Sequence, residues 1–380
     1  MNTINRRGAL KLGIATAAGT ALYGGLAGCV GVVRRDFKSP PGDPGAHKGS
    51  LSHTILEYAA MAPSGHNTQP WRVHLRDAAN FALYVDNTRR LPEIDPDDRE
   101  LRMSLGGFIE NLVLASGALG RAAEVVICEG DKTGGPIATI RLEQDTATGY
   151  SLERIERRCT VRHRLASRAL PASTVAALIG DAGASVRFIS NDSAQAAAIR
   201  NATLEAFRQQ SLRDAAQREL SRWIRFDDAS ASRHRDGLTP ESMGITGFSG
   251  WIVRKFYKPD DVMSSSFRKR GIDGTAEQVQ QAGGWFVVSS PDSTTNSLIA
   301  AGRAFARMAL RSRELSVGLH PMEQALEEEP YRTQILSVLA GAGIPQIIVR
   351  AGFVDTYPEP VSLRRPVDAF VTTTSPQTPT

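Results

Sequence analysis

The densest group of residues suited to binding a ligand lies in the segment MAPSGHNTQPWRV, residues 61–73. Small residues let a backbone approach a ligand closely, and amide side chains offer both donors and acceptors to a planar heterocycle. The residues that combine these properties are Pro63, Ser64, Gly65, His66, Asn67 and Gln69. Pro70 and Trp71 then close the segment, and we expect Trp71 to pack in the core. The pattern predicts one wall of a small-molecule site.

A second segment, ERRCTVRHRL at 156–165, has chemistry suited to a phosphate. Arg158 and Arg162 are four residues apart, so in a helix they would share one face and could direct two guanidinium groups at one phosphate. The alternative is ordinary surface charge paired with acids such as Glu156. Cys159 lies beside these cations, which would favour its thiolate. A buried packing cysteine is the interpretation that we prefer.

The composition excludes several classes of protein. The chain of 380 residues is 41% hydrophobic and carries a formal charge of +5, with only three cysteines and seven histidines. No C-x-x-C or H-x-x-x-H spacing occurs, so zinc sites and disulfide scaffolds are disfavoured, and no metal is expected. A basic stripe with interleaved aromatic residues is also missing from the sequence, which argues against a nucleic-acid partner. We expect a globular protein.

The N-terminus has the pattern of an export signal. Arg6, Arg7 and Lys11 precede a weakly apolar, Gly- and Ala-rich run that ends in Leu-Ala-Gly-Cys at 26–29. The paired arginines resemble a twin-arginine signal, and the end of the run resembles a lipobox with Cys29 as the lipidated residue. We therefore expect a signal peptide at 1–28 and a lipidated cysteine with a flexible linker at 29–50. An uncleaved membrane anchor is the alternative.

The body of the chain alternates helical and strand-like patterns, as in an α+β fold. Helices are expected at 51–61, 100–119, 192–223 and 296–315, and strands at 81–85, 123–128, 284–290 and 346–350. Residues 226–270 mix glycine, serine, charges and isolated aromatics without a clear period, which is typical of a lid or a flexible excursion. The end of the chain, 372–380, is expected to be a mobile tail.

An internal comparison suggests a duplication. An offset of 196 residues superposes GGFIENLVLASGALG on GRAFARMALRSRELS, so that Gly106 matches Gly302 and Leu112 matches Met308. Helical periods often match by chance. The match nevertheless favours a chain in which two fused halves imitate a symmetric dimer.

Taken together, these segments resemble the nitroreductase family of FMN-dependent oxidoreductases, which have an α+β sandwich fold and are normally dimers. APSGHNTQPW is similar to the family segment Pro-Ser-x-x-Asn-x-Gln-Pro-Trp, and ERRCTVRHRL to its Arg-x-Ser/Thr-x-Arg/Lys segment. The resemblance extends over most of 51–371 and is greatest to the single-chain branch, in which two half-domains are fused. It implies a first half at 51–146 and a second half at 147–371, with a lid-like insertion at about 226–270.

The resemblance also assigns roles to residues. It implies that Arg158, Thr160 and Arg162 contact the FMN phosphate, with Arg364 and Arg365 completing that pocket. Pro63, Ser64 and Asn67 would meet the flavin from the opposite half, and backbone groups of Pro321, Met322 and Glu323 would reach its N5 edge. The sequence departs from the family at Gln324, where many members have glycine. His66 either touches the ring or caps the loop. The remaining residues counted in the predicted cofactor site are Gly65, Gln69 and Cys159.

The function implied is an exported, lipid-anchored FMN oxidoreductase that reduces nitroaromatics, quinones or similar small acceptors by two electrons. Its partners would be a small-molecule electron donor and acceptor, and the chain would be a monomer that forms a pseudo-dimer. No dedicated catalytic acid or base is expected, since the cofactor supplies the reactivity. No Gly-x-Gly-x-x-Gly fingerprint for a nicotinamide domain occurs. Two alternatives stay open: a flavin-binding or flavin-sequestering protein with a covered site and little turnover, and a carrier of another ligand.

Overall fold

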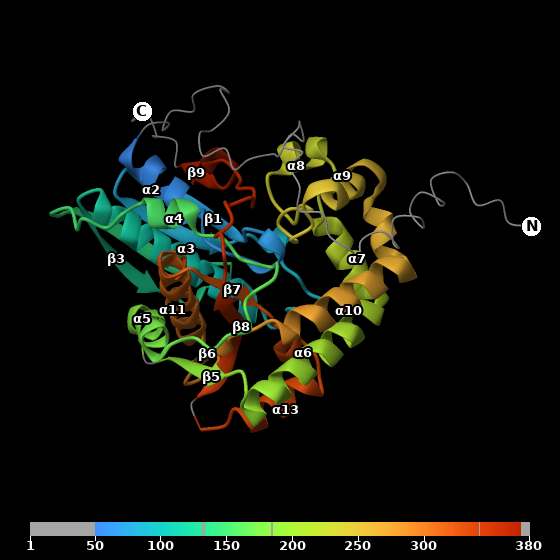
Figure 1. Cartoon of the computed structure of the whole chain (residues 1–380). Coiled ribbons are helices and arrows are strands. Elements are labelled where there is room, and N and C mark those ends of the chain that lie inside the picture. The colour runs from blue at the N-terminus through green and yellow to red at the C-terminus, as the bar shows by residue number, and fades with distance from the viewer. Residues whose placement is uncertain (1–49, 131–133, 184, 342, 374–380) are drawn as a thin grey trace, which may run out of the picture.

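The computed structural model describes residues 50–130, 134–183, 185–341 and 343–373 (Figure 1). The predicted signal peptide, Cys29 and all of the predicted linker before Ser50 lie outside these residues. Within the described ranges no helix is both long and apolar enough to cross a bilayer. The helices and strands together make a mixed α and β protein, as expected.

The first sheet has the strand order β3-β4-β2-β1-β9. Neighbouring strands are antiparallel, except that the C-terminal strand β9 pairs with β1 in parallel. Helices α2 and α3 bury their apolar faces against this sheet, and the side chain of Ser50 caps α2 by accepting a hydrogen bond from the backbone N–H of His53. The elements are α2 Leu51–Ala59, β1 Trp71–Leu75, β2 Asn80–Val85, α3 Arg99–Ala118, β3 Arg121–Ile127, β4 Ala138–Gln144 and β9 Val371–Thr373.

The second sheet has the order β5-β6-β8-β7 and is antiparallel throughout. Every residue of β6 is buried because helices cover both faces of the sheet. Phe286 and Val288 pack with α5 and α11, whereas Trp285 and Val287 pack with α6 and α13. The elements are α5 Ala172–Ala182, β5 Val186–Ser190, α6 Ala194–Leu212, β6 Gly284–Ser290, α11 Thr295–Ser312, β7 Val317–Pro321, α12 Gln324–Glu327, α13 Tyr331–Val338 and β8 Ile344–Phe353.

The two sheets repeat one pattern of connection. The first four strands of the order β3-β4-β2-β1-β9 correspond in sequence to β7-β8-β6-β5, and the helix before β3 or β7 is α3 or α11. These two helices cross at the matched glycines: a Cβ on Gly106 would lie 2.2 Å from the carbonyl oxygen of Ile299, and one on Gly302 would lie 2.0 Å from that of Met103. The offset that relates Gly106 to Gly302 also relates Met103 to Ile299. The contact is therefore reciprocal.

The segment 226–270 is not the irregular excursion that the sequence predicts. It contains α8 Asp228–His234, α9 Gly247–Phe256 and the start of α10 Ser265–Gln280, which Figure 1 shows beside α7 Asp214–Trp223. Short helices give weak periodic signals, but side-chain caps at Asp227 and Ser264 start two of them. A small apolar cluster centred on Ile224, Phe226, Leu238 and Val262 joins the end of α7 to α9 and the start of α10 through Val253 and Phe267.

Two further boundaries differ from the sequence expectation. The single helix expected at 192–223 is divided into α6 and α7, because Arg213 adopts an extended conformation between them. The predicted tail begins too early, since Thr372 and Thr373 belong to β9. The remaining short elements are α4 Glu153–Arg157 and the 3₁₀ turns η1 Gly65–Asn67, η2 Asn87–Arg89, η4 Pro259–Met263, η5 Arg313–Leu315 and η6 Val367–Ala369.

Candidate functional site

The loop after α2 has an unusual backbone. His66, Asn67 and Gln69 have φ values of 45°, 53° and 55°, although none of them is glycine. Such conformations cost free energy, and they persist where the surrounding structure holds them. Ser64 contributes to this support, because its Oγ accepts a hydrogen bond from the backbone N–H of Gln69 at 3.0 Å. The sequence segment predicted as a binding wall is therefore a constrained loop.

Both amide side chains of this loop bind distant parts of the chain. Asn67 donates from Nδ2 to the carbonyl oxygens of Gly237 and Leu363, each at 3.1 Å. Gln69 donates to the carbonyl oxygen of Arg235 at 2.9 Å, and its Oε1 accepts the backbone N–H of Arg365 at 2.8 Å. Trp71 is fully buried against Phe108, as predicted. The loop is thus tied both to the C-terminal segment and to the segment after α8.

Arg364 and Arg365 are buried and hold the loop from the other side. Arg364 donates to the carbonyl oxygens of Met61 and Ala62, each at 3.1 Å, and to Oδ1 of Asn67 at 2.8 Å. Arg365 donates to the carbonyl oxygens of Gln69 and Trp71. The carbonyls just after α2 lie at the negative end of the helix dipole, which cations stabilise. These contacts give both arginines a positioning role, while their contact with a phosphate stays a prediction.

Arg158 and Arg162 do not share a helix face, so that part of the sequence interpretation is wrong. Helix α4 ends at Arg157, and Arg158 is extended with φ of −66° and ψ of 132°. Tertiary contacts bring the two side chains into one region instead. Arg158 donates to the carbonyl oxygen of Met61 at 3.2 Å, and Arg162 donates to that of Ser242 at 2.8 Å. Burial and the charge of Arg158 lower the pKa of Arg162 to about 10.

Two histidines and a third arginine join this region. Burial, with a contribution from Arg162, lowers the pKa of His66 to about 4. Burial also lowers the pKa of His320, with further contributions from Arg350 and then Arg162. Arg350 donates to the carbonyl oxygen of His163 and lies 3.2 Å from Nδ1 of His320. We call Arg158, Arg162, Arg350, His66 and His320 the cationic cluster.

The cationic cluster has an excess of positive charge. Among the described residues, no carboxylate forms an ion pair with Arg162 or Arg350, and Nδ1 of His66 is buried without a hydrogen-bond partner. Buried charge of one sign is costly unless something compensates it. Because arginine does not deprotonate near neutral pH, the cluster is suited to an anionic ligand. The sequence analysis did not select His320 or Arg350. His320 directly precedes the predicted site residue Pro321, which could have indicated it, and no sequence signal marks Arg350.

A second group of buried charges adjoins the same loop. Arg99 lies 3.0 Å from the carboxylate of Glu100 and 3.1 Å from that of Glu323. Glu100 also shares a hydrogen bond with Glu327, and Oε2 of Glu100 would lie 3.0 Å from a Cβ at Gly65. Burial raises the pKa of Glu323 to about 8 and raises that of Glu100 and Glu327. We call these four residues the carboxyl cluster, of which the sequence predicted only Glu323.

The remaining predicted residues lie around the two clusters. Pro321 ends β7, and Met322 is 2% exposed and uses its backbone N–H to bond the carbonyl oxygen of Ile348 at 2.8 Å. The thiol of Cys159 lies 3.5 Å from the carbonyl oxygen of Pro358. Thr160 and Pro63 are partly buried. The described residues hold no group of three or more metal-ligating side chains.

Comparison with known proteins gives distant relatives. No known family model matches the chain. A protein of Mycobacterium tuberculosis (strain H37Rv) named "Putative NAD(P)H nitroreductase" is 26% identical over 333 residues, which cover 84% of this chain and 90% of that protein. A second protein of that strain with the same description, acg, is 35% identical over 72 residues, covering 19% of this chain and 22% of that protein. These similarities support the nitroreductase family.

Proposed function

We propose that this protein is an exported FMN-binding oxidoreductase of the nitroreductase type. It would accept two electrons from a small-molecule donor and reduce nitroaromatics, quinones or similar small acceptors. The observation that carries the proposal is the cationic cluster beside the constrained loop at 63–69. A phosphate monoester is the part of FMN that such a cluster can compensate. The names of the relatives point to the same class of reaction.

The residues present fit the cofactor at the phosphate end. Arg158 and Arg162 would hold the phosphate, with Thr160 between them as a hydroxyl partner. Nδ1 of His66 is buried and has no hydrogen-bond partner among the described residues. His66 belongs to the loop that we expect at the flavin edge. With a pKa of about 4, His66 is neutral at pH 7 and can donate or accept there. The cofactor, when bound, supplies the two-electron chemistry.

Arg364 and Arg365 have a different part in the proposal. Their donors already bind the carbonyl oxygens of Met61, Ala62, Gln69 and Trp71. We infer that they position the loop, so that its strained residues keep their conformation when the cofactor is absent. Their charge still adds to the local positive potential.

We also propose that one chain forms a pseudo-dimer. Support comes from the equivalent strand orders of the two sheets and from the reciprocal contact of Gly106 and Gly302. Strand β9 adds to this, because the C-terminal end of the second half pairs with β1 of the first. A monomer would then contain what dimeric members of the family build from two chains.

The cellular location of the protein is a separate part of the proposal. The motif with Arg6 and Arg7 supports the twin-arginine route, and Cys29 supports a lipid anchor in the cell envelope. We expect Cys29→Ser to release the protein from membranes and Arg6→Lys with Arg7→Lys to block its export. Membrane binding that survives Cys29→Ser would favour an uncleaved helix instead.

A covered, slowly turning site is the second candidate. Ser242 accepts the hydrogen bond of Arg162, and a Cβ on Gly244 would lie 3.6 Å from that of Arg162. The segment before α9 therefore packs against the proposed phosphate site. If it also lies over the flavin ring, NADH and NADPH would reduce the flavin slowly, whereas dithionite would reduce it at once.

Two measurements test these proposals. The absorption spectrum of the purified full chain should show flavin bands, and a colourless folded protein would favour a carrier of another ligand. Stopped-flow bleaching of those bands by NADPH, NADH or dithionite then distinguishes an oxidoreductase with an open flavin site from a protein whose flavin is covered. Rapid bleaching by millimolar NADPH followed by rapid reoxidation with a quinone would exclude the covered site.

A further inference from the structure

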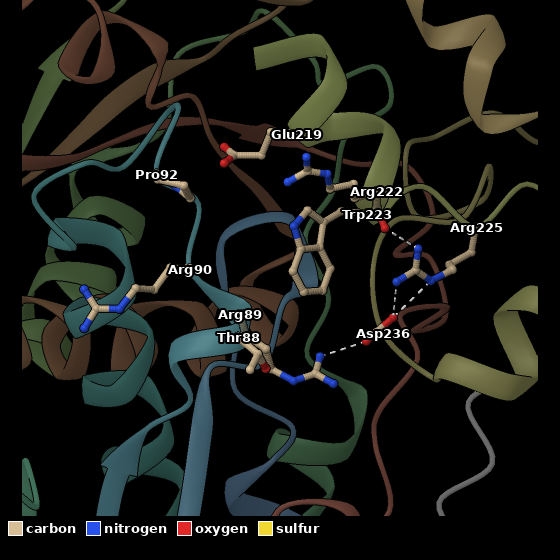
Figure 2. Close-up of a pocket in the computed structure, with 9 residues that line it drawn as sticks. All are labelled: Thr88, Arg89, Arg90, Pro92, Glu219, Arg222, Trp223, Arg225 and Asp236. Carbon is tan, nitrogen blue, oxygen red and sulfur yellow. Dashed lines mark hydrogen bonds and ion pairs between the residues drawn. The ribbon is translucent and has the colours of Figure 1, made fainter. Parts of the chain in front are cut away.

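A cavity of about 250 Å³ lies between η2 and the C-terminal end of α7 (Figure 2). It is distinct from the two clusters but adjoins the same loop, because Arg89 on its wall donates to the carbonyl oxygen of Thr68 at 2.9 Å. Most ligand pockets have volumes of roughly 300–1,000 Å³. This cavity therefore has room for one ring system, and a larger ligand would extend from its opening.

The floor of the cavity is an ordered network of charges. Asp236 is 3% exposed and binds Arg225 at 2.7 Å and Arg89 at 2.8 Å. Both guanidinium groups lie 5.9 Å from the ring centre of Trp223, which Figure 2 shows in the middle of the lining residues. Asp86, which lies 3.2 Å from Arg89, adds a second carboxylate, so these ion pairs compensate both arginines and the network holds the indole in place. An indole held in this way is a platform for a flat ring.

Two lining groups are left for a ligand. Glu219 is 3% exposed, and its Oε2 accepts the backbone N–H of Glu93 at 3.1 Å. Its Oε1 is buried without a hydrogen-bond partner among the described residues, which is costly. Arg222 is exposed and forms no ion pair within 4 Å among the described residues, and its charge lowers the pKa of Glu219 against the rise that burial causes. Figure 2 shows both side chains on the same side of Trp223.

These features specify a ligand with three parts: a flat ring for Trp223, one N–H donor for Oε1 of Glu219, and an anionic group for Arg222. Only one oxygen of Glu219 is available, so a single amino group such as that of adenine fits better than the paired donors of guanine. Arg222 stands at the solvent side, where a phosphate extending from the opening would lie.

We propose that this cavity binds an adenosine phosphate, with adenine beside Trp223 and Glu219 and the phosphate facing Arg222. Two sources share this chemistry: free AMP, and the adenosine half of a nicotinamide dinucleotide. The proposal does not depend on the cofactor site, because none of the cationic cluster lines this cavity.

Calorimetric titration of the full chain tests the proposal. AMP should bind, and Arg222→Ala should weaken its binding at least tenfold, because the variant loses the charge-assisted contact with the phosphate. The affinity for adenosine should not change with Arg222→Ala. The matched control is Arg218→Ala, an exposed arginine on the same helix, which should leave AMP binding unchanged.

Ligand variants test the base and the source without altering the fold. IMP presents an acceptor in place of the amino group of AMP, so it should bind at least tenfold more weakly. Binding of NADH or NADPH that is tighter than that of AMP and equally sensitive to Arg222→Ala would identify the dinucleotide as the source, and AMP binding alone would identify the mononucleotide.

The proposal is overturned if millimolar AMP does not bind, if Arg222→Ala and Arg218→Ala have equal effects, or if IMP matches AMP. Each titration is readable whether or not the protein contains flavin. Failure of the proposed oxidoreductase function would therefore appear in the absorption spectrum and not in these affinities.

Discussion

The cationic cluster and the carboxyl cluster adjoin one loop, but burial shifts the pKa values of their residues in opposite directions. Burial favours the neutral form of every ionisable group. The carboxyl cluster can reach neutrality by holding protons, and the raised pKa of Glu323, about 8, reflects this. In the cationic cluster the two histidines can become neutral by losing a proton, but the arginines cannot. Of the two clusters, the cationic cluster is therefore the one suited to an anionic ligand, because no described carboxylate pairs with Arg162 or Arg350.

The largest effect is expected on removing an arginine that we propose binds the phosphate. We expect Arg162→Ala and Arg158→Ala each to weaken FMN binding by roughly tenfold to over a hundredfold, because a charge-assisted contact contributes about 1.5–3 kcal/mol. Riboflavin, which lacks the phosphate, should bind both variants almost as tightly as the wild type. Fluorescence titration measures both affinities. Arg164→Ala is the control, since Arg164 is exposed two residues along. Equal losses for FMN and riboflavin would make the arginines purely structural.

The carboxyl cluster should make the protein less stable as the pH rises. The pKa of Glu323 is about 8 in the folded chain against 4.5 ordinarily, so the folded state binds more protons between these values. This stabilisation is complete below pH 4.5 and is lost as the pH passes through 8, with a slope of at most about 1.4 kcal/mol per pH unit. Glu323→Gln should flatten that decline in urea unfolding measured across the range.

The exposed Glu277 provides the control for this measurement, because Glu277→Gln should leave the slope as it is in the wild type. If Glu323→Gln keeps the full decline between pH 4.5 and 8, the carboxyl cluster does not hold its proton at Glu323.

His66, whose Nδ1 is buried, should give a dependence of stability on pH of the opposite sign over a narrower range. Burial lowers the pKa of His66 from 6.5 to about 4, so the unfolded state binds more protons between these values. The corresponding stability is present above pH 6.5 and is lost as the pH falls through 4. His66→Asn should reduce this acid loss, and asparagine tolerates the positive φ at this position. His163→Asn, at an exposed histidine, should not. Unfolding curves that coincide for wild type and His66→Asn at every pH would contradict the assignment.

Gly65→Ala, which places a methyl group between the loop and the carboxyl cluster, should have the smallest effect on stability. A Cβ at Gly65 would lie 3.0 Å from Oε2 of Glu100 and 3.3 Å from Leu91, so the neighbours must shift slightly. We expect Gly65→Ala to lower the free energy of unfolding by about 1 kcal/mol through overpacking. The comparison is Gly180→Ala, in helix α5, where a Cβ meets nothing within 4 Å and should stabilise slightly. Unchanged stability in Gly65→Ala would show that Glu100 moves freely.

Sequence patterns predicted the elements that have a strong local signal. The helices at 51–59 and 99–118 and the strands β2, β6 and β8 lie close to their expected positions. The short helices α8 and α9 were missed because seven and ten residues give little periodic signal. Isolated helices of this length depend on tertiary contacts, such as the packing of Val253 of α9 in the cluster around Phe226 and Val262. The break at Arg213 was also missed, since no proline or glycine marks it.

Some residues of the candidate site could likewise be predicted from the sequence, and others could not. Residue types in 61–73 identified the loop, and its resemblance to a known family suggested the arginines at 158 and 162. His320, Arg350 and Glu100 could not be selected from the sequence, because each acquires its meaning from a partner far along the chain. Arg99, for example, lies 224 positions from Glu323 in the sequence.

The residue types along the chain already contain the chemistry available to this protein: a loop of small and amide residues, a pair of arginines, and the apolar periods that make the two sheets and their helices. These depend on side-chain types and on local backbone preference, which a linear pattern contains. Which charges compensate one another depends instead on how the chain folds. In the folded chain Arg364 binds the carbonyls after α2 and Arg365 binds those of Gln69 and Trp71. Burial favours protons on the carboxyl cluster, and Arg162 and Arg350 have no carboxylate partner among the described residues. The reason is that electrostatic energy depends on distance and burial in space, and the folded chain sets both between residues hundreds of positions apart.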